Sequence, residues 1–96
     1  MNNKHVLIIE DDIFQQDMLK RFVTQALNCQ PKAVCNANDA IAECNQHVFD
    51  IVFCDLNLPD IDGVALIKHI AQTQINSQLI VNSAESEDVV KTAKHI

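Results

Sequence analysis

The organisation of this chain is clearest in the segment Ile51-Val52-Phe53-Cys54-Asp55-Leu56-Asn57-Leu58-Pro59-Asp60-Ile61-Asp62-Gly63. Its apolar first part is typical of a short strand that is buried on both faces of a parallel sheet. Asp55 ends this strand, and the turn-forming residues after it predict a loop. The loop leads through Gly63 into residues 64–73, where Leu66, Ile67 and Ile70 have helical spacing. The stretch therefore predicts one strand–loop–helix unit.

The same unit is repeated along the chain. We expect strands at 6–9, 32–36, 51–54 and 78–82, and helices at 13–27, 39–47, 64–73 and from Ser86 onward. Asp12 and Gln15 have the spacing of a capping box, and Asn38 is the expected cap of the second helix. In the first helix, Phe14, Met18 and Phe22 are expected to share one broad apolar face with Leu19, Val23 and Ala26. Alternating strands and helices predict an α/β fold, a doubly wound parallel sheet with helices on both faces.

Carboxylates follow two of the predicted strands. Glu10, Asp11 and Asp12 come after the first strand, and Asp55 ends the third. Because the carboxyl ends of parallel strands meet at one edge of a sheet, these like charges are expected to lie together, with Ser83 at the same edge. Their repulsion is relieved by a cation, and a divalent metal with oxygen ligands is the natural choice.

Composition excludes several classes of protein. The 96 residues are 48% hydrophobic, enough for one small core, and the net charge of −6 disfavours nucleic acid or an anionic membrane as a partner. The single glycine excludes a glycine-rich phosphate loop. The four cysteines form no CxxC pair and are expected to be reduced. No signal peptide or apolar stretch of membrane-spanning length occurs, so we expect a soluble, cytoplasmic protein.

Three segments together resemble the receiver domain of bacterial two-component response regulators, the CheY-like family. They are Val6-Leu7-Ile8-Ile9-Glu10-Asp11-Asp12, the stretch from Asp55 to Gly63, and Leu79-Ile80-Val81-Asn82-Ser83-Ala84. The resemblance implies the flavodoxin/CheY-like strand order 2-1-3-4. Receivers have five βα units, whereas this chain ends within the expected fourth helix. We therefore expect residues 1–96 to form a single incomplete receiver domain, truncated before the fifth strand and helix.

The resemblance also implies a function. Asp55 would be the phosphoacceptor, taking a phosphoryl group from a phosphohistidine of a sensor histidine kinase or histidine phosphotransfer protein. Asp11 would bind Mg²⁺ directly and Glu10 through water, with the backbone carbonyl of Asn57 beside Asp55. Ser83 would be the switch hydroxyl that moves towards the phosphate. Such a module is no enzyme, although it assists its own phosphorylation and dephosphorylation.

The chain also departs from the family pattern. Receivers carry a Lys on the fifth strand, and Lys91 and Lys94 are instead expected on the surface of the fourth helix. Without a fifth strand, the fourth would have an exposed edge through which the chain could self-associate.

Other functions stay open beside a phosphoacceptor. A degenerate receiver would act only as a protein-binding or dimerisation module. A Mg²⁺-dependent phosphohydrolase would want a second acid where Asn57 stands. A flavodoxin-like cofactor binder is disfavoured by the acidic loop after the first strand, which would repel a phosphate.

Overall fold

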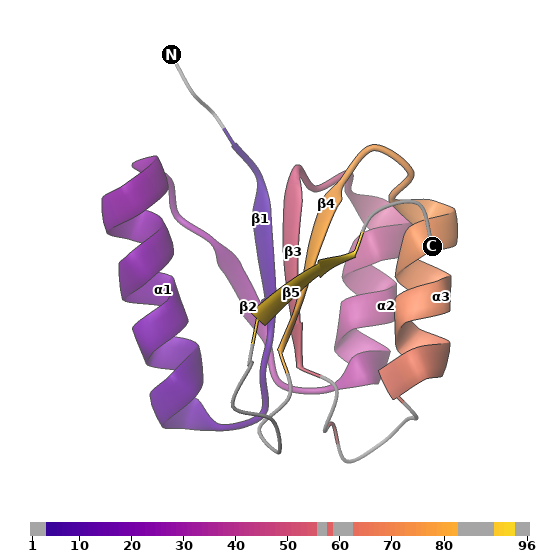
Figure 1. Cartoon of the computed structure of the whole chain (residues 1–96), viewed down its shortest axis with the longest axis horizontal. Coiled ribbons are helices and arrows are strands. Elements are labelled where there is room, and N and C mark those ends of the chain that lie inside the picture. The colour runs from indigo at the N-terminus through magenta and orange to yellow at the C-terminus, as the bar shows by residue number, and fades with distance from the viewer. Residues whose placement is uncertain (1–3, 56–57, 59–62, 83–89, 94–96) are drawn as a thin grey trace.

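The computed structural model describes residues 4–55, 58, 63–82 and 90–93. Strands and helices alternate along most of the chain (Figure 1). In order they are β1 (Val6–Ile9), α1 (Ile13–Leu27), β2 (Lys32–Val34), α2 (Ala37–Gln46), β3 (Ile51–Asp55), α3 (Gly63–Thr73), β4 (Gln78–Asn82) and β5 (Val90–Ala93). The predicted elements are thus confirmed up to β4, with shifts of one or two residues at some ends.

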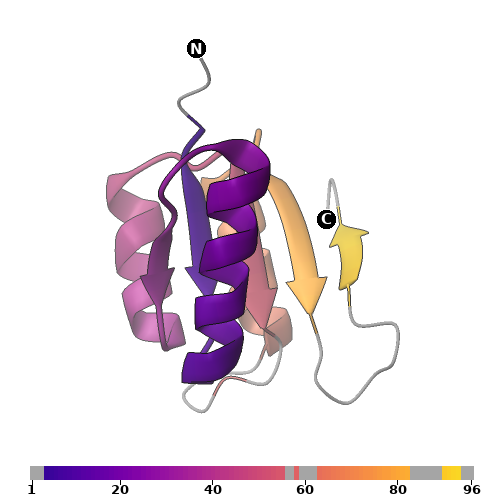
Figure 2. The same ribbon diagram turned by 90° about the vertical axis from the view of Figure 1, so that its left-hand side faces the viewer.

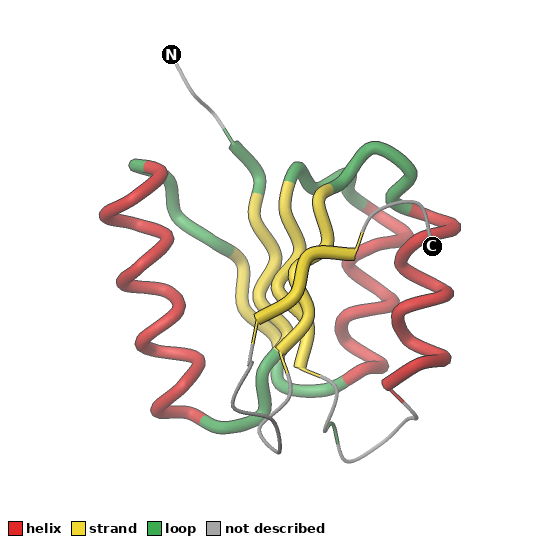
Figure 3. The backbone as a smooth tube through the Cα atoms, in the orientation of Figure 1, coloured by secondary structure: helices red, strands yellow, loops and turns green. Residues whose placement is uncertain are grey.

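The strands form one sheet in the order β2-β1-β3-β4-β5 (Figures 1 and 3). The first four are parallel, which confirms the predicted order 2-1-3-4. Ile9 pairs with Val34 of β2 on one side and with Cys54 of β3 on the other. Because β2 and β3 lie on opposite sides of β1, the strand order reverses at β1. The carboxyl ends of β1 and β3 flank this point of reversal.

Helices cover both faces of the sheet, with α1 on one face and α2 and α3 on the other (Figure 1). The larger core lies under α2 and α3 and includes Leu7, Ile9, Val52, Leu66 and Ile70. The smaller core lies under α1 and is built on Val6, Ile8 and Val23. Viewed from the side of α1, the helix covers only part of its face, and β4 and β5 lie beyond it (Figure 2).

Helix α1 begins and ends at polar caps. The Asp12 carboxylate accepts hydrogen bonds from the backbone N–H groups of Phe14, at 2.9 Å, and Gln15, at 3.4 Å. The predicted N-cap is therefore confirmed. Asn28 ends the helix in the left-handed region with φ of 54°, which asparagine tolerates better than most residues. The helix is fixed at both ends by local chemistry.

The predicted apolar face of α1 is wrong in part. Phe14, Met18 and Phe22 are 83%, 68% and 58% exposed, and their spacing of four residues places them on one stripe of the helix. Val23 packs on the sheet with the partly buried Leu19 and Leu27 on either side of it. The helix carries two apolar rows, and only one can face the strands.

A buried glutamine holds the connection between α2 and β3. The Gln74 side chain is 3% exposed. Its carbonyl oxygen accepts the Phe49 N–H at 2.7 Å, and its amide nitrogen donates to the carbonyls of Cys44 and His47 at 2.9 and 2.8 Å. One side chain thus satisfies three backbone groups at the edge of the sheet where β3 begins.

The cap of α2 is also displaced from its predicted place. Asn36, rather than Asn38, accepts the Asp39 N–H at 2.8 Å, so α2 begins at Ala37. The earlier start adds Ala37 to Ala40 and Cys44, the other buried residues of this helix. Both asparagines are good caps, and burial of Ala37 accompanies the earlier start.

The prediction for residues after Ser86 is wrong at 90–93. These residues, including Lys91, form β5 and not part of a fourth helix, and β5 pairs antiparallel with β4 over Leu79–Asn82. The expected exposed edge of β4 is therefore paired, and the basis for self-association through it is lost. Pairing satisfies backbone groups that an open edge would leave to solvent, and β-branched Val90 and Thr92 favour a strand. Ser86 and Lys94 lie outside the described residues.

Four free cysteines divide into two groups. Cys44 and Cys54 are buried in the larger core, whereas Cys29 is half-buried and Cys35 is exposed. Burial raises the pKa of the Cys44 thiol to about 11 and that of Cys54 to about 12. Both core thiols therefore stay protonated and act as small apolar groups.

Within the described part of the chain, no helix is long and apolar enough to cross a membrane.

Candidate acidic metal site

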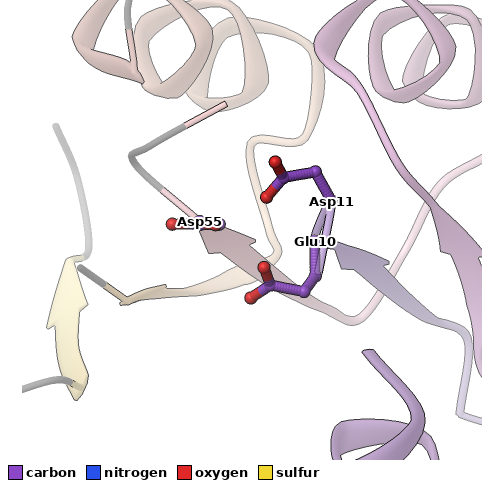
Figure 4. Close-up of side chains that lie close together, drawn as sticks. All are labelled: Glu10, Asp11 and Asp55. Carbon is purple, nitrogen blue, oxygen red and sulfur yellow. The ribbon is translucent and has the colours of Figure 1, made fainter. Parts of the chain in front are cut away.

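Three carboxylates meet at the carboxyl ends of β1 and β3. Glu10, Asp11 and Asp55 each offer an oxygen, and these oxygens lie within 4.8 Å of one another (Figure 4). Glu10 and Asp55 are 2% and 6% exposed, and Asp11 is open to solvent. The structure therefore brings together three of the four carboxylates that the sequence predicts at this edge, whereas Asp12 caps α1.

Strand register explains why they meet. Ile9 pairs with Cys54, so Glu10 and Asp55 are the next residues on adjacent parallel strands. The Glu10 N–H donates to the Val34 carbonyl at 3.0 Å, which extends the pairing of β1 with β2 by one residue. Glu10 is thus held by the sheet although it lies after β1, and Asp11 starts the turn into α1.

Glu10 is in an unfavourable place for a charge. Burial raises its pKa from the ordinary value of 4.5 to about 7. A hydrogen bond to Asp55 and the charges of Asp55 and Asp11 also raise this pKa, whereas the Asp12 N–H, at 3.1 Å from the Glu10 carboxylate, lowers it. That N–H bond fills the role that the capping box assigned to Gln15. In the absence of a cation, the Glu10 carboxyl therefore keeps its proton to a higher pH than an ordinary glutamate does.

The donor set suits a hard divalent cation. Mg²⁺ prefers oxygen ligands, uses few carboxylates and keeps several waters. Two buried carboxylates and one exposed carboxylate supply the oxygens while leaving one side open to solvent. A cation here would also relieve the repulsion that raises the pKa of Glu10. The cluster is consistent with the Mg²⁺ site of a receiver.

An apolar hollow of about 300 Å³ adjoins the cluster on the face that α1 covers. Its walls include Leu19 and Phe22 of α1 and Phe53 and Ile80 of the sheet, and Glu10 and Asp55 also line it. The exposed stripe of α1, which we define as Phe14, Met18 and Phe22, begins at the turn that carries Asp11. Apolar surface for contact with another molecule thus lies next to the carboxylates.

Other predicted site residues fall outside the described part of the chain. These are Asn57, with its predicted carbonyl ligand, and the switch hydroxyl of Ser83. Sequence reasoning missed Gln16, whose buried side-chain amide nitrogen donates to the Glu10 and Val34 carbonyls at 3.0 and 3.2 Å. The signal that could have found it is its spacing, because Gln16 lies seven places before the buried Val23 and therefore on the same inward face of α1.

Comparison with known proteins agrees with this geometry. The family described as "Response regulator receiver domain" matches residues 6–95. Chemotaxis protein CheY of Thermotoga maritima is 31% identical over 87 residues, which are 91% of this chain and 72% of that protein. Transcriptional regulatory protein MalR of Bacillus subtilis is 27% identical over 89 residues, and the chain spans only 38% of its length.

Solved structures share the fold. A response regulator from Burkholderia pseudomallei, with a phosphorylated aspartic acid, superposes with a TM-score of 0.80 at 20% identity, over 88% of this chain and 49% of that one. Response regulator TrrA of Thermotoga maritima, in complex with Mg²⁺-BeF, gives a TM-score of 0.76 at 21% identity, over 84% and 70%. With the family match over residues 6–95, these findings show that the chain belongs to the response regulator receiver domain family.

Proposed function

We propose that this chain is a phosphoacceptor module of a two-component phosphorelay, with Asp55 as the acceptor. The observation that carries the proposal is the convergence of the Glu10, Asp11 and Asp55 carboxylates within 4.8 Å at the switch point of the sheet. Members of the family are generally phosphoacceptor modules rather than enzymes. The proposal treats residues 1–96 as one receiver unit, acting in the cytoplasm.

The chemical step is phosphoryl transfer between side chains. A carboxylate oxygen of Asp55 attacks the phosphorus of a phosphohistidine, an O–P bond forms, and the P–N bond breaks. The histidine leaves as an imidazole that takes up a proton, and Asp55 becomes an acyl phosphate. Asp55 ends β3 with its backbone in the sheet, so the acceptor oxygen is presented from a rigid element.

Mg²⁺ would be held by Asp11 and Asp55, with Glu10 acting mainly through water and the Asn57 carbonyl completing the set. When bound, Mg²⁺ supplies positive charge that offsets the charge of the transferring phosphoryl oxygens. The related TrrA structure, which contains Mg²⁺-BeF, supports this choice of metal. Ser83 would then donate its hydroxyl hydrogen to a phosphoryl oxygen, as its place after β4 suggests.

The phosphodonor would be a sensor histidine kinase or a histidine phosphotransfer protein. The exposed stripe of α1 supports this partner, because a protein that brings a phosphohistidine to Asp55 must also cover the surface beside it. Phe14 is 83% exposed two residues after the acidic turn, where contact with a donor protein would bury it. Phosphotransfer from each sensor kinase of the same organism would identify the donor, with Phe14→Ser expected to slow transfer from it.

Phosphorylation by a small donor tests the assignment of Asp55. Incubation with acetyl phosphate and Mg²⁺ should add one phosphoryl group, seen as a mass increase of the intact protein. Asp55→Asn should abolish the increase, whereas the control Asp17→Asn, on the exposed surface of α1, should retain it. Equal labelling of both variants would refute the acceptor. If the folded wild type takes up no phosphate, a receiver that only binds other proteins becomes the better description.

A further inference from the structure

Gln16 is an unusual residue for the inward face of α1. Its side chain is 8% exposed, and Val23 is the other buried residue of this helix. Burial of a primary amide is unfavourable unless its polar atoms are hydrogen-bonded. The contacts of Gln16 therefore explain why a polar residue occupies this place.

The amide nitrogen of Gln16 joins three elements. It donates to the Glu10 carbonyl at 3.0 Å and to the Val34 carbonyl at 3.2 Å. The same Val34 carbonyl accepts the Glu10 N–H at 3.0 Å. Helix α1 is thus tied to the ends of β1 and β2 at the residue that supplies a carboxylate to the acidic cluster.

The Glu10 carbonyl belongs to the planar peptide group that links Glu10 to Asp11. A hydrogen bond to that carbonyl restrains the rotation of the peptide plane, and the plane sets the directions in which both side chains leave the backbone. The Glu10 carboxylate has a second restraint, the Asp12 N–H at 3.1 Å. One contact therefore holds the main chain of the cluster and the other holds a side chain.

We propose that Gln16 is a positioning residue for the metal site, which keeps Glu10 and Asp11 directed at Asp55. This inference rests on the proposed Mg²⁺-binding role of the cluster. Removal of a group that orients a metal ligand commonly weakens metal binding about 10- to 100-fold. Gln16→Met keeps the length of the side chain and removes both hydrogen bonds, so its affinity for Mg²⁺ should fall about tenfold or more.

Gln74 offers a matched control. It is also a buried glutamine whose amide nitrogen donates to two backbone carbonyls, but those carbonyls, of Cys44 and His47, lie outside the acidic cluster. Gln74→Met should destabilise the fold without changing the affinity of the folded protein for Mg²⁺. The dissociation constants of both variants and the wild type are measured by isothermal titration of Mg²⁺ at a temperature where all three are folded.

A second readout does not depend on the metal. Amide hydrogen exchange at Asp12, followed by NMR, reports whether the Glu10 carboxylate keeps its place. Exchange should be about tenfold faster in Gln16→Met and unchanged in Gln74→Met after correction for global stability. If Gln16→Met does not fold, Gln16→Asn is the substitute, because its amide is one methylene shorter and cannot reach both carbonyls.

The results separate the two proposals. Weaker Mg²⁺ binding and faster Asp12 exchange in Gln16→Met alone would support the positioning role. Wild-type affinity in Gln16→Met, or an equal loss in Gln74→Met, would overturn it. If the wild type binds no Mg²⁺, the proposed function fails, and the exchange rate at Asp12 alone decides whether Gln16 holds Glu10.

Discussion

The acidic cluster should make the metal-free protein less stable as pH rises, and Glu10→Gln should remove this effect. Glu10 has a pKa of about 7 in the fold against an ordinary value of 4.5. A raised pKa means that the native state binds the proton more tightly than the unfolded state. Its contribution to stability is therefore full below pH 4.5 and is lost as pH rises to about 7. At 1.36 kcal/mol for each pKa unit, the loss is about 3 kcal/mol at most.

Glutamine keeps the shape of Glu10, can still accept the Asp12 N–H and carries no charge. Without Mg²⁺, Glu10→Gln should match the wild type near pH 4.5 and exceed its free energy of unfolding by up to about 3 kcal/mol at pH 8. Urea unfolding at a series of pH values in the presence of a chelator measures the difference. The same substitution at Glu43, whose carboxylate lies 3.7 Å from the Lys32 ammonium outside the cluster, is the control and should give no such gain.

Two results would refute this reasoning. Stability curves that run parallel from pH 4.5 to 8 would show that neither burial nor the neighbouring carboxylates disfavour the charged form of Glu10. A variant that is less stable than the wild type at pH 8 without metal would show that its carboxylate contributes favourably. Saturating Mg²⁺ should reverse the order at pH 8, because a cation that binds only the native state stabilises it by mass action.

Three further outcomes are expected. Millimolar Mg²⁺ should raise the melting temperature of the wild type and raise that of Asp11→Asn less; equal shifts would count against Asp11 as a ligand. Gln74→Met leaves three backbone groups without their partner, two of them buried, and should lower the free energy of unfolding by about 2–4 kcal/mol in urea. A change under about 0.5 kcal/mol would contradict the role given to this side chain. Asp12→Ala should lower stability by about 1 kcal/mol in thermal unfolding while Asp12→Asn retains most of it, because asparagine is also a good N-cap.

Much of the fold could be predicted because its signals are local. The apolar runs that end at Ile9 and Cys54 mark buried strands, and the carboxylates after them mark the edge where they gather. Parallel pairing of Ile9 with Cys54 then places Glu10 and Asp55 next to each other on adjacent strands. The acidic cluster was thus predictable from the ends of two strands.

What could not be predicted depends on contacts between distant segments. Helix α1 has two apolar rows, and only one of them packs on the sheet. Gln16 lies on the same face as Val23, as its spacing indicates, but a glutamine is expected at the surface unless its amide is hydrogen-bonded. The hydrogen bonds to the Glu10 and Val34 carbonyls that allow its burial are not visible in the sequence. The start of a helix after Ser86 had good local signals. Antiparallel pairing of β5 with the preceding strand β4 overrides them at 90–93.

The difference in burial among the cysteines provides a built-in probe of how often the core of this protein opens. A thiol reagent needs a cysteine that is both accessible and deprotonated. In the native state, Cys44 and Cys54 are buried and their raised pKa values keep them protonated. Their alkylation must wait until the core opens, whereas exposed Cys35 reports the activity of the reagent in the same sample. Because Cys54 directly precedes Asp55, the slowing of its alkylation by Mg²⁺ or by acetyl phosphate would measure, by mass spectrometry, how firmly an occupied site holds the fold closed.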